Sequence, residues 1–577
     1  MRRRLVLPIL VSALALTGCG LSIGPKPVRA AQSLPGTAAG GVLRVGITQP
    51  RTMDPGLVND DASRLIVRTM CDTLVTVDPK TGFITPGLAR KWTVTTDTHD
   101  NTQIVFALRK GLRFPDGSVF NAKGVTASIA RIAQEKFASP RSYLLSDVDG
   151  YRVARNRSQF DKPPKEGLLF GVAPTDQYGV SVTLTLRNGA ELRNFADPVL
   201  APISPRKVGA TFGGRETNDP QCIGPYRLAT PWKTTDRVIV LERNADYAGT
   251  SPAFTRSGKS WADRIEFHVY PSTRAATVAF RAGEVDVAPF ALSDRAAQVA
   301  AGDVVEGNGD YLQFIGLPLG PGSPFESPAV RLALSQALDR RRIVDNVYGG
   351  GRQVATSFLP PSLGPEYAEH PCGTGAGSPL TEHGDVAVAK RILEIVKVDL
   401  SSTTTKLYYY DKAPGDAALV AEVARQWHAA VGLTAVPTPM SKKAFTDRFL
   451  EVSSIDGAFS SGWSEPGDAA IWWLYEAYTS EGVGAGNIAG FTNKRFEIFL
   501  KRKVLPRDDG SDAKGDQKER AIWVAKAQEE LCKLTPLLPI AFSKSHWLIR
   551  ASAIGGARDF ELDVHGDPVL RELYLRA

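Results

Sequence analysis

Apolar and polar positions recur with two different periods along the chain, and together they predict alternating strands and helices. Period-two alternation at 43–47 puts Leu43, Val45 and Ile47 on one face and predicts a strand. Apolar positions near helical spacing predict a helix over 62–74. The same two patterns predict strands at 105–109, 180–186, 237–242, 264–269, 406–410, 433–436, 538–542 and 547–550, and helices at 121–132, 272–282, 328–348, 385–396, 417–431 and 516–534. This alternation favours an α/β or mixed α+β fold.

The first nineteen residues have a pattern of their own. Arg2, Arg3 and Arg4 precede an apolar run from 5 to 16, which is too short to span a bilayer. A basic segment, a short apolar segment and small residues are typical of a secretion signal. Leu-Thr-Gly-Cys at 16–19 looks like a bacterial lipobox, in which Cys19 receives lipid; an ordinary signal peptide is the alternative. We therefore expect a signal over 1–18 and an extracytoplasmic protein, lipid-anchored to the outer face of the cytoplasmic membrane.

The remainder of the chain predicts a large folded body behind a spacer. Residues 19–40 are rich in Gly, Pro, Ala and Ser without apolar periodicity, which favours a flexible linker. About 535 residues follow, enough for two or three lobes, and no later stretch reaches transmembrane length. The net charge of +8 is spread through the chain. The arginine triplet 340–342 follows Asp339 in a helical pattern, so we interpret it as a solvated helix face and expect no nucleic-acid partner.

Residues that would carry catalysis or hold a metal are scattered. The seven histidines show no HExxH spacing, and the one G-x-S-x-G, at 20–24, lies in the spacer without the strand and helix that a nucleophile elbow needs. Besides Cys19 the chain has Cys71, Cys222, Cys372 and Cys532, an even number without CxxC spacing. In an exported protein this predicts two disulfides with three possible connectivities, and no zinc site. The sequence thus favours a binding protein over an enzyme, with no metal and no cofactor.

Eight motifs occur in an order that is informative as a set. They are Met53-Asp54-Pro55, Cys71–Leu74, Pro86–Ala89 with Trp92, Phe106–Gly111 with Phe114–Gly117, Ile223–Tyr226, Arg243-Asn244 with Tyr247, Ala282–Asp286 and Val330–Arg340. The series resembles the extracytoplasmic solute-binding proteins of family 5 in ABC importers, the peptide/nickel type, from about residue 41 to about 475. Cys222 departs from the family's glycine at that position. Most of these residues suit turns and caps, so we expect them to maintain the fold rather than touch a ligand.

The resemblance implies a periplasmic-binding-protein-like type II fold of two lobes, with an additional domain inserted in the first. The implied boundaries are 41–73, 195–270 and 535–577 for lobe I, 74–194 for the extra domain and 271–534 for lobe II. It also implies the pairings Cys71–Cys222 and Cys372–Cys532. Each of these would lie within one lobe, whereas a bridge across lobes would oppose closure.

The segment 459–468 resembles the family's Gly-Trp-x-x-Asp-x-x-Asp-Pro stretch, where an aspartate of peptide-binding members pairs with the ligand's α-amino group. This chain departs from the pattern, because Glu465-Pro466 stands near the usual aspartate and Asp468 follows three residues later. We expect Glu465 first and Asp468 second to take this role, with Trp463 as a pocket wall. Gly462, Ser461 and, on the strand holding Tyr408–Tyr410, Tyr409 complete the expected ligand site, whereas Trp472, Trp473 and Tyr475 are expected to pack a helix.

The function implied by this resemblance is capture of peptides, from dipeptides to oligopeptides, by lobe closure and their delivery to an ABC transporter permease. We expect a monomer without catalysis. A nickel chelate, an oligosaccharide or another small polar solute is an alternative ligand, because a fold does not fix its ligand. A signalling or adhesion lipoprotein on the same fold is the alternative from another class.

Overall fold

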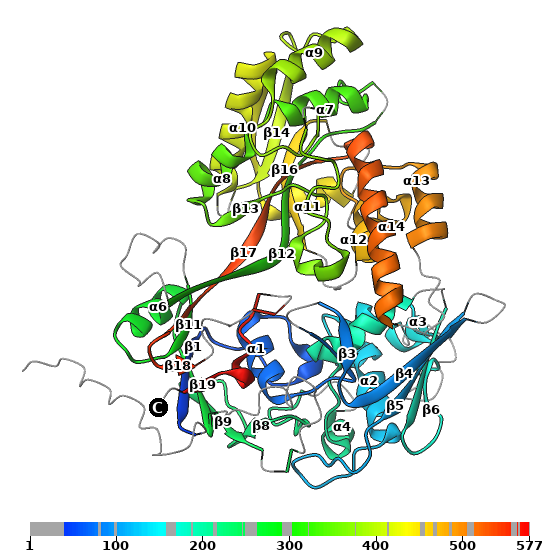
Figure 1. Cartoon of the computed structure of the whole chain (residues 1–577), viewed down its shortest axis with the longest axis vertical. Coiled ribbons are helices and arrows are strands. Elements are labelled where there is room, and N and C mark those ends of the chain that lie inside the picture. The colour runs from blue at the N-terminus through cyan, green and yellow to red at the C-terminus, as the bar shows by residue number, and fades with distance from the viewer. Residues whose placement is uncertain are drawn as a thin grey trace, which may run out of the picture.

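Two lobes joined by two long strands make up the protein in the computed structural model (Figure 1). The structure describes residues 40–78, 82–96, 101–156, 169–185, 189–211, 216–244, 246–247, 262–290, 303–320, 322–375, 377–411, 413, 415–450, 456–464, 470–483, 487–504, 513–555, 562–563 and 566–575. Cys19, the signal and the spacer lie outside these residues, as do Glu465 and Asp468.

The largest sheet runs through both lobes. Its strand order is β15-β14-β16-β12-β17-β11-β1-β10-β9-β8, and β13 pairs with β17 beside this path. β12 (Val304–Gly316) and β17 (Leu538–Ile549) are antiparallel and pass from one lobe to the other (Figure 1). Their register shifts between Asn308 and Leu312, so the ladder is interrupted where the lobes meet.

The first lobe is built on the strands at one end of this sheet. β1 (Val42–Ile47) runs parallel to β10 (Arg264–Val269) and β11 (Val287–Pro289), and β9 (Val238–Arg243) and β8 (Tyr226–Leu228) complete the edge. α1 (Asp61–Met70) begins at Asp60, whose side chain accepts a hydrogen bond from the Ser63 N–H, and buries Leu65 and Ile66. α6 (Thr273–Arg281) packs against β1 and β11.

A second sheet belongs to the first lobe. Its order is β4-β5-β7-β6, formed by β4 (Ala89–Thr96), β5 (Thr102–Leu108), β7 (Gly179–Leu184) and β6 (Val172–Pro174), with α2 (Ala122–Ala133) against it. One hydrophobic cluster includes Val45 and Leu65 together with Phe106 and Val125 of this part. The additional sheet therefore shares a core with the lobe that carries it.

The second lobe places helices on both faces of its strands. α7 (Pro328–Gln336), α8 (Arg340–Tyr348), α9 (Val386–Val396) and α10 (Asp416–Val431) share a core with Ile315 and Leu407, whereas α12 (Ala470–Tyr478), α13 (Lys494–Phe499) and α14 (Ala513–Leu534) share one with Phe314 and Phe459. Between these layers lie β14 (Thr404–Tyr410), β15 (Thr434–Met440) and β16 (Ala458–Ser464), which are mutually parallel. The alternation of Phe314 and Ile315 between two cores follows from the period of a strand.

The remaining helices and strands are short. They are β2 (Val75–Val77), β3 (Ile84–Pro86), α3 (Tyr151–Arg155), α4 (Pro205–Thr211), β13 (Arg352–Val354), α11 (Lys442–Leu450), β18 (Ile554–Gly555) and β19 (Tyr574–Leu575). No helix among the described residues is long and apolar enough to cross a membrane.

Four of the sequence expectations need correction. Arg340 of the arginine triplet, expected on a solvated helix face, is 0% exposed and donates hydrogen bonds to protein oxygens. The helix predicted over 328–348 is two helices, because the Asp339 side chain accepts a hydrogen bond from the Arg342 N–H at 2.8 Å and starts α8 afresh. The strands predicted at 538–542 and 547–550 are one strand, β17. Two of the expected lobe boundaries also change. β11 pairs with β1, so residues 273–289 belong to the first lobe and lobe II does not begin at 271. Residues 538–542, expected in lobe I, pair with 312–315 of the second lobe.

Both expected disulfides are confirmed. Cys71, at the end of α1, is bonded to Cys222, and Cys372 is bonded to Cys532 on α14. Each bridge closes a loop within one lobe, and the first encloses the whole β4-β5-β7-β6 sheet. Neither bridge restrains one lobe against the other.

Candidate functional site

The cleft between the lobes lies where parallel strands of both lobes end. β1, β10 and β11 end at one side, and β14 and β16 end at the other. Ligands of open α/β sheets bind outside the carboxyl ends of such strands. A cavity of about 520 Å³ occupies this position. Its walls include Ile47, Thr48, Asp61, Arg64, Leu65, Thr273, Pro289 and Phe290 of the first lobe, Gly309, Asp310, Ser543, Lys544, Ser545, His546 and Trp547 of the crossing strands, Ser464 of the second lobe, and Asp567.

Paired charges line the wall formed by the first lobe. Arg64 Nε lies 2.7 Å from Asp567 Oδ2, and another nitrogen of the same guanidinium lies 3.0 Å from the exposed Asp61 carboxylate. Burial alone would lower the pKa of Arg64, but Asp567 and Asp61 outweigh it and raise that pKa. Nearby, Arg68 contacts Asp563 at 2.7 Å, and burial raises the pKa of the Asp563 carboxyl to about 6. The C-terminal segment is thus fixed to α1 by two ion pairs beside the cavity.

The crossing strands add a second group of charges. Lys544 Nζ lies 3.0 Å from Glu306 Oε2, and His546 Nε2 lies 3.5 Å from Glu306 Oε1. The His546 side chain is only 2% exposed. Lys544 and His546 line the cavity, and the Lys544 ammonium adds a cationic group to a lining that also holds the Asp61 and Asp567 carboxylates. Such walls suit a solute that carries both charges.

The end of β16 reaches the cleft at Ser464. Ser464, directly before Glu465, lines the cavity. The Tyr311 side chain packs directly over Gly462. A Cβ at position 462 would lie 1.7 Å from Tyr311 Oη, so a residue with a side chain does not fit there. The Ser461 carbonyl accepts a hydrogen bond from Gln313 Nε2 at 2.9 Å. These contacts place the end of β16 against β12.

The aromatic residues predicted around the site have mainly packing contacts. The rings of Trp463 and Trp473 are in edge-on contact, with their centroids 4.3 Å apart. Trp473 is buried, as expected for a residue that packs a helix. Trp463 does not line the described cavity. Tyr409 is half-buried against the core shared with α7–α10, and it does not line the cavity either.

Sequence reasoning missed a polar cluster of the second lobe, which we call the Arg352 cluster. It consists of Tyr311, Gln313, Tyr348, Arg352, Asp416 and Ser460. Asp416, at the first turn of α10, is 7% exposed and accepts one hydrogen bond, from Ser460 Oγ at 3.4 Å. Burial raises the pKa of the Asp416 carboxyl to about 6, although Arg352 and Ser460 act to lower it.

The raised pKa of Asp416 predicts a pH-dependent stability difference. Because the folded-state pKa lies above the ordinary value of 3.8, the contribution of Asp416 to stability is fully present below about pH 4 and is lost as the pH rises through 6. We therefore expect Asp416→Asn to gain about 1–3 kcal/mol relative to wild type between pH 4 and pH 7. Denaturant unfolding of both proteins across this range measures the difference, and a difference that does not change with pH contradicts the prediction.

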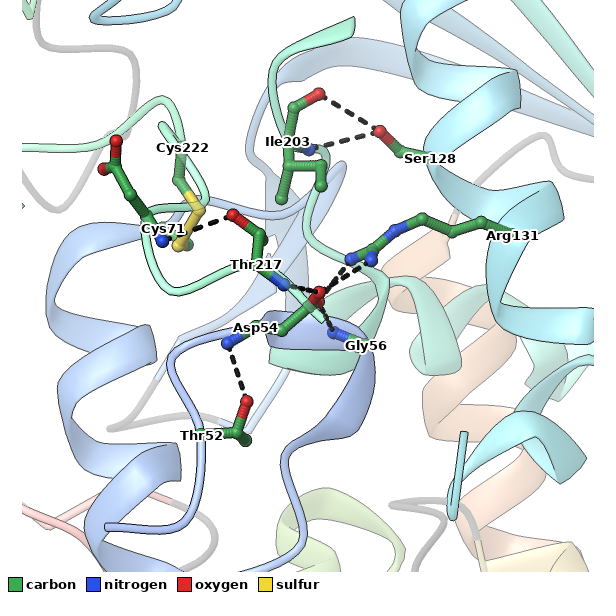
Figure 2. Close-up of polar contacts among 10 residues, drawn as sticks. Thr52, Asp54, Gly56, Cys71, Ser128, Arg131, Ile203, Thr217 and Cys222 are labelled. Atoms are coloured by element: carbon green, nitrogen blue, oxygen red, sulfur yellow. Dashed lines mark hydrogen bonds and ion pairs between the residues drawn. A yellow bond between two sulfur atoms is a disulfide. The ribbon is translucent and has the colours of Figure 1, made fainter. Parts of the chain in front are cut away.

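The residues of the family-like motifs, by contrast, hold the fold together. Asp54 and Arg131 form a buried ion pair with contacts of 2.6 and 2.9 Å, and the Asp54 carboxylate also accepts hydrogen bonds from the Gly56 and Thr217 N–H groups, each at 3.0 Å (Figure 2). Asp286, directly before β11, pairs at 2.6 Å with Arg44 of β1. The expectation that these motifs serve the fold is therefore confirmed for both aspartates.

Metal ligation has no support among the described residues, where no three His, Cys, Asp or Glu side chains are placed to hold an ion. Ser461 and Gly462 lie on β16 beside Ser464, but only Ser464 of these three lines the cavity. Arg64, Lys544, His546 and Asp567 were missed because no local motif marks them, and their spacing in the sequence exceeds 500 residues at its widest.

Comparisons with known proteins agree on one group. A profile described as "Bacterial extracellular solute-binding proteins, family 5 Middle" matches residues 84–482. The glutathione-binding protein GsiB of Salmonella choleraesuis is 25% identical over 542 residues, covering 92% of this chain and 93% of that protein.

Two solved structures have the same fold. The unliganded open form of the periplasmic murein tripeptide-binding protein MppA has a TM-score of 0.76 at 20% identity, covering 95% of this chain and 99% of that chain. OppA of Haemophilus influenzae in complex with the peptide RPPGFSPFR has a TM-score of 0.60 at 19% identity, covering 94% of this chain and 100% of that chain. These likenesses establish the two-lobed fold expected from the sequence.

Proposed function

Because this chain belongs to family 5 of the bacterial extracellular solute-binding proteins, we propose that it captures a short peptide or a peptide-like solute such as glutathione and delivers it to an ABC transporter permease. The observation that carries this proposal is the position of the cavity. It lies at the carboxyl ends of parallel strands from two lobes that are joined by β12 and β17. A solute in this cavity touches both lobes and favours their closure.

Closure requires the crossing strands to bend, and their sequence suits bending. Gly307-Asn308-Gly309 lies at the register shift between β12 and β17. A Cβ on Gly309 would lie 2.1 Å from Ser543 Oγ, so only glycine lets the strands approach this closely. A short interrupted ladder costs less to deform than a continuous one, which makes this the natural hinge.

A peptide fits the exposed edge of β16. The ladder between β14 and β16 ends at Phe459, whereas β16 continues to Ser464 and, among the described strands, pairs there only with β12. An extended peptide can add to such an edge through its main chain, with little dependence on its side chains. The charged walls at Arg64, Asp567 and Lys544 suit its two termini.

We further propose that Glu465 and Asp468 supply the acceptor for the solute's ammonium group. The support is the position of Ser464, the residue before Glu465 in the sequence, in the cavity wall. A buried ammonium needs a charged acceptor, because an unpaired one is costly.

Lipid attachment at Cys19 and location at the outer face of the cytoplasmic membrane form part of the same proposal. Its support is the lipobox-like Leu-Thr-Gly-Cys after a short apolar run. Cells fed a labelled fatty acid should label the wild-type protein and not Cys19→Ser. Equal labelling of both would contradict the anchor.

The function is tested by native mass spectrometry of the gently purified mature chain, followed by titration with glutathione and with pools of dipeptides to pentapeptides. Adducts that fragment as peptides support the proposal, and Glu465→Gln/Asp468→Asn should then weaken binding by about tenfold or more, the effect expected for a lost charge-assisted hydrogen bond. A single adduct that is not peptide-like would replace the proposed solute class. If the wild-type protein is purified without a bound ligand and binds none of these probes, the proposal is contradicted.

A further inference from the structure

Arg352, in the Arg352 cluster, pairs with a residue that lines the cavity, although it does not line the cavity itself. It is the first residue of β13 and lies directly opposite Ser543 in the β13–β17 ladder. Directly opposed residues of antiparallel strands have their side chains on the same face. Ser543 lines the cavity and accepts a hydrogen bond from the Tyr311 N–H at 3.0 Å. The Arg352 side chain thus lies on the same face as Ser543, beside Tyr311.

Two aromatic rings and one amide fix the direction of this guanidinium. Arg352 Cζ lies over the rings of Tyr348 and Tyr311, at 4.0 and 5.5 Å from their centroids. Arg352 Nη1 donates to Gln313 Oε1 at 3.2 Å. Rings stacked on the faces of a guanidinium leave its N–H donors pointing outward in its plane.

The amide that contacts Arg352 is itself held. Gln313 Nε2 donates to Ser460 Oγ at 3.0 Å and to the Ser461 carbonyl at 2.9 Å, so the amide oxygen is turned to Arg352. Gln313 is 1% exposed and cannot easily rearrange. The guanidinium is therefore positioned before any solute arrives.

Five other enclosed arginines of this protein are held by carboxylates or by several protein oxygens. Arg44, Arg131 and Arg520 pair with carboxylates at 2.6 Å. Arg331 and Arg340 have no such carboxylate, but they donate to four and five protein oxygens.

Arg352 differs from all of these. In the part of the chain that the structure describes, it has no carboxylate within 4 Å and donates one hydrogen bond, to Gln313. The Asp416 carboxylate interacts electrostatically with the Arg352 guanidinium, but it lies more than 4 Å away and forms no ion-pair contact with it. Arg352 consequently keeps donor groups for a partner that the described residues do not supply.

We propose that Arg352 binds a carboxylate of the solute and makes the protein selective for solutes with a free carboxylate. This inference rests on the proposed function and adds the chemistry by which the second lobe recognises its ligand. A guanidinium is the side chain suited to two-point recognition of a carboxylate. Its stacking on Tyr348 and Tyr311 means that little side-chain entropy is lost on binding.

The test compares matched probes that differ only at the carboxylate. A pool of tripeptides with free C-termini and the same pool as C-terminal amides are titrated against wild type, Arg352→Gln and Arg352→Lys, with bound mass read by native mass spectrometry. Wild type should prefer the free acids by about tenfold to a hundredfold, since a hydrogen bond to a charged group contributes about 1.5–3 kcal/mol. In Arg352→Gln the ratio of the affinity for free acids to the affinity for amides should fall to about one, and in Arg352→Lys part of the wild-type preference should remain.

Arg391→Gln, an exposed arginine on α9, is the matched control and should keep the wild-type preference. A thermal unfolding curve for each variant shows that it is folded, and Arg352→Lys keeps the test decisive if Arg352→Gln is unstable. An unchanged preference in Arg352→Gln, or no preference in wild type, overturns the role of Arg352 and leaves the proposed function standing. Failure of wild type to bind either pool overturns this inference, and the proposed function falls with it only if glutathione and the pools of dipeptides to pentapeptides also fail to bind.

Discussion

Replacing Asp54 with alanine is expected to lower the free energy of unfolding of the first lobe by about 3–5 kcal/mol, because removal of one partner leaves a buried charge uncompensated. The side chains of Asp54 and Arg131 are 0% and 1% exposed. The substitution also removes the acceptor of the Gly56 and Thr217 N–H groups (Figure 2). Denaturant unfolding, followed by circular dichroism at constant pH, measures the loss.

An exposed ion pair of the same protein is the control. Lys443 and Asp447 on α11 are in contact at 2.6 Å, but their side chains are 84% and 58% exposed. Lys443→Ala should therefore change the free energy of unfolding by less than about 0.5 kcal/mol. A loss in Asp54→Ala as small as that of Lys443→Ala would show that the buried pair does not stabilise the first lobe.

The second large effect is expected on removing the disulfide between Cys71 and Cys222. The double variant Cys71→Ala/Cys222→Ala should lose about 3–5 kcal/mol, because the bridge closes a long loop and so restricts the unfolded chain. The two cysteines are 151 residues apart, and the β4-β5-β7-β6 sheet lies entirely between them. Thermal unfolding measures the loss, and limited proteolysis should show first cleavage between residues 72 and 221.

The other bridge provides the comparison. Cys372→Ala/Cys532→Ala should shift the first cleavage into the second lobe, because that bridge joins α14 to the segment before α9. Identical cleavage patterns for the two double variants would contradict the assignment of one bridge to each lobe.

Much of the fold follows from local patterns in the sequence. Period-two and helical spacing predicted β1, α1, β10 and α10 close to their bounds, because each buries one regular face. The division between α7 and α8 was missed, since apolar residues continue across Asp339 and only its cap reveals the break. β12 was missed for a different reason. Its first half, Val-Val-Glu-Gly-Asn-Gly-Asp-Tyr, crosses the cleft with little core to bury and so lacks the apolar alternation of a strand.

The candidate site was predictable only where a motif marks it. The resemblance around Trp463 led to the end of β16, whose Ser464 lines the cavity, whereas Glu465 and Asp468 remain predictions. Arg352 has no motif and gains its position from the pairing of β13 with β17. Arg64 and Asp567 meet through a contact that spans 503 positions of the chain. Such groups become adjacent only through the packing of distant elements, which no local spacing encodes.

The order of the two disulfides along the chain has a consequence for biogenesis. Each cysteine of the described pairs is bonded to the next one in sequence, first Cys71 to Cys222 and then Cys372 to Cys532. A chain that is translocated from its N-terminus presents these cysteines to an oxidising compartment one at a time. An oxidase that joins each cysteine to the next one to emerge therefore makes the native bonds directly. Maturation of this protein should accordingly require a disulfide oxidase and proceed without an isomerase.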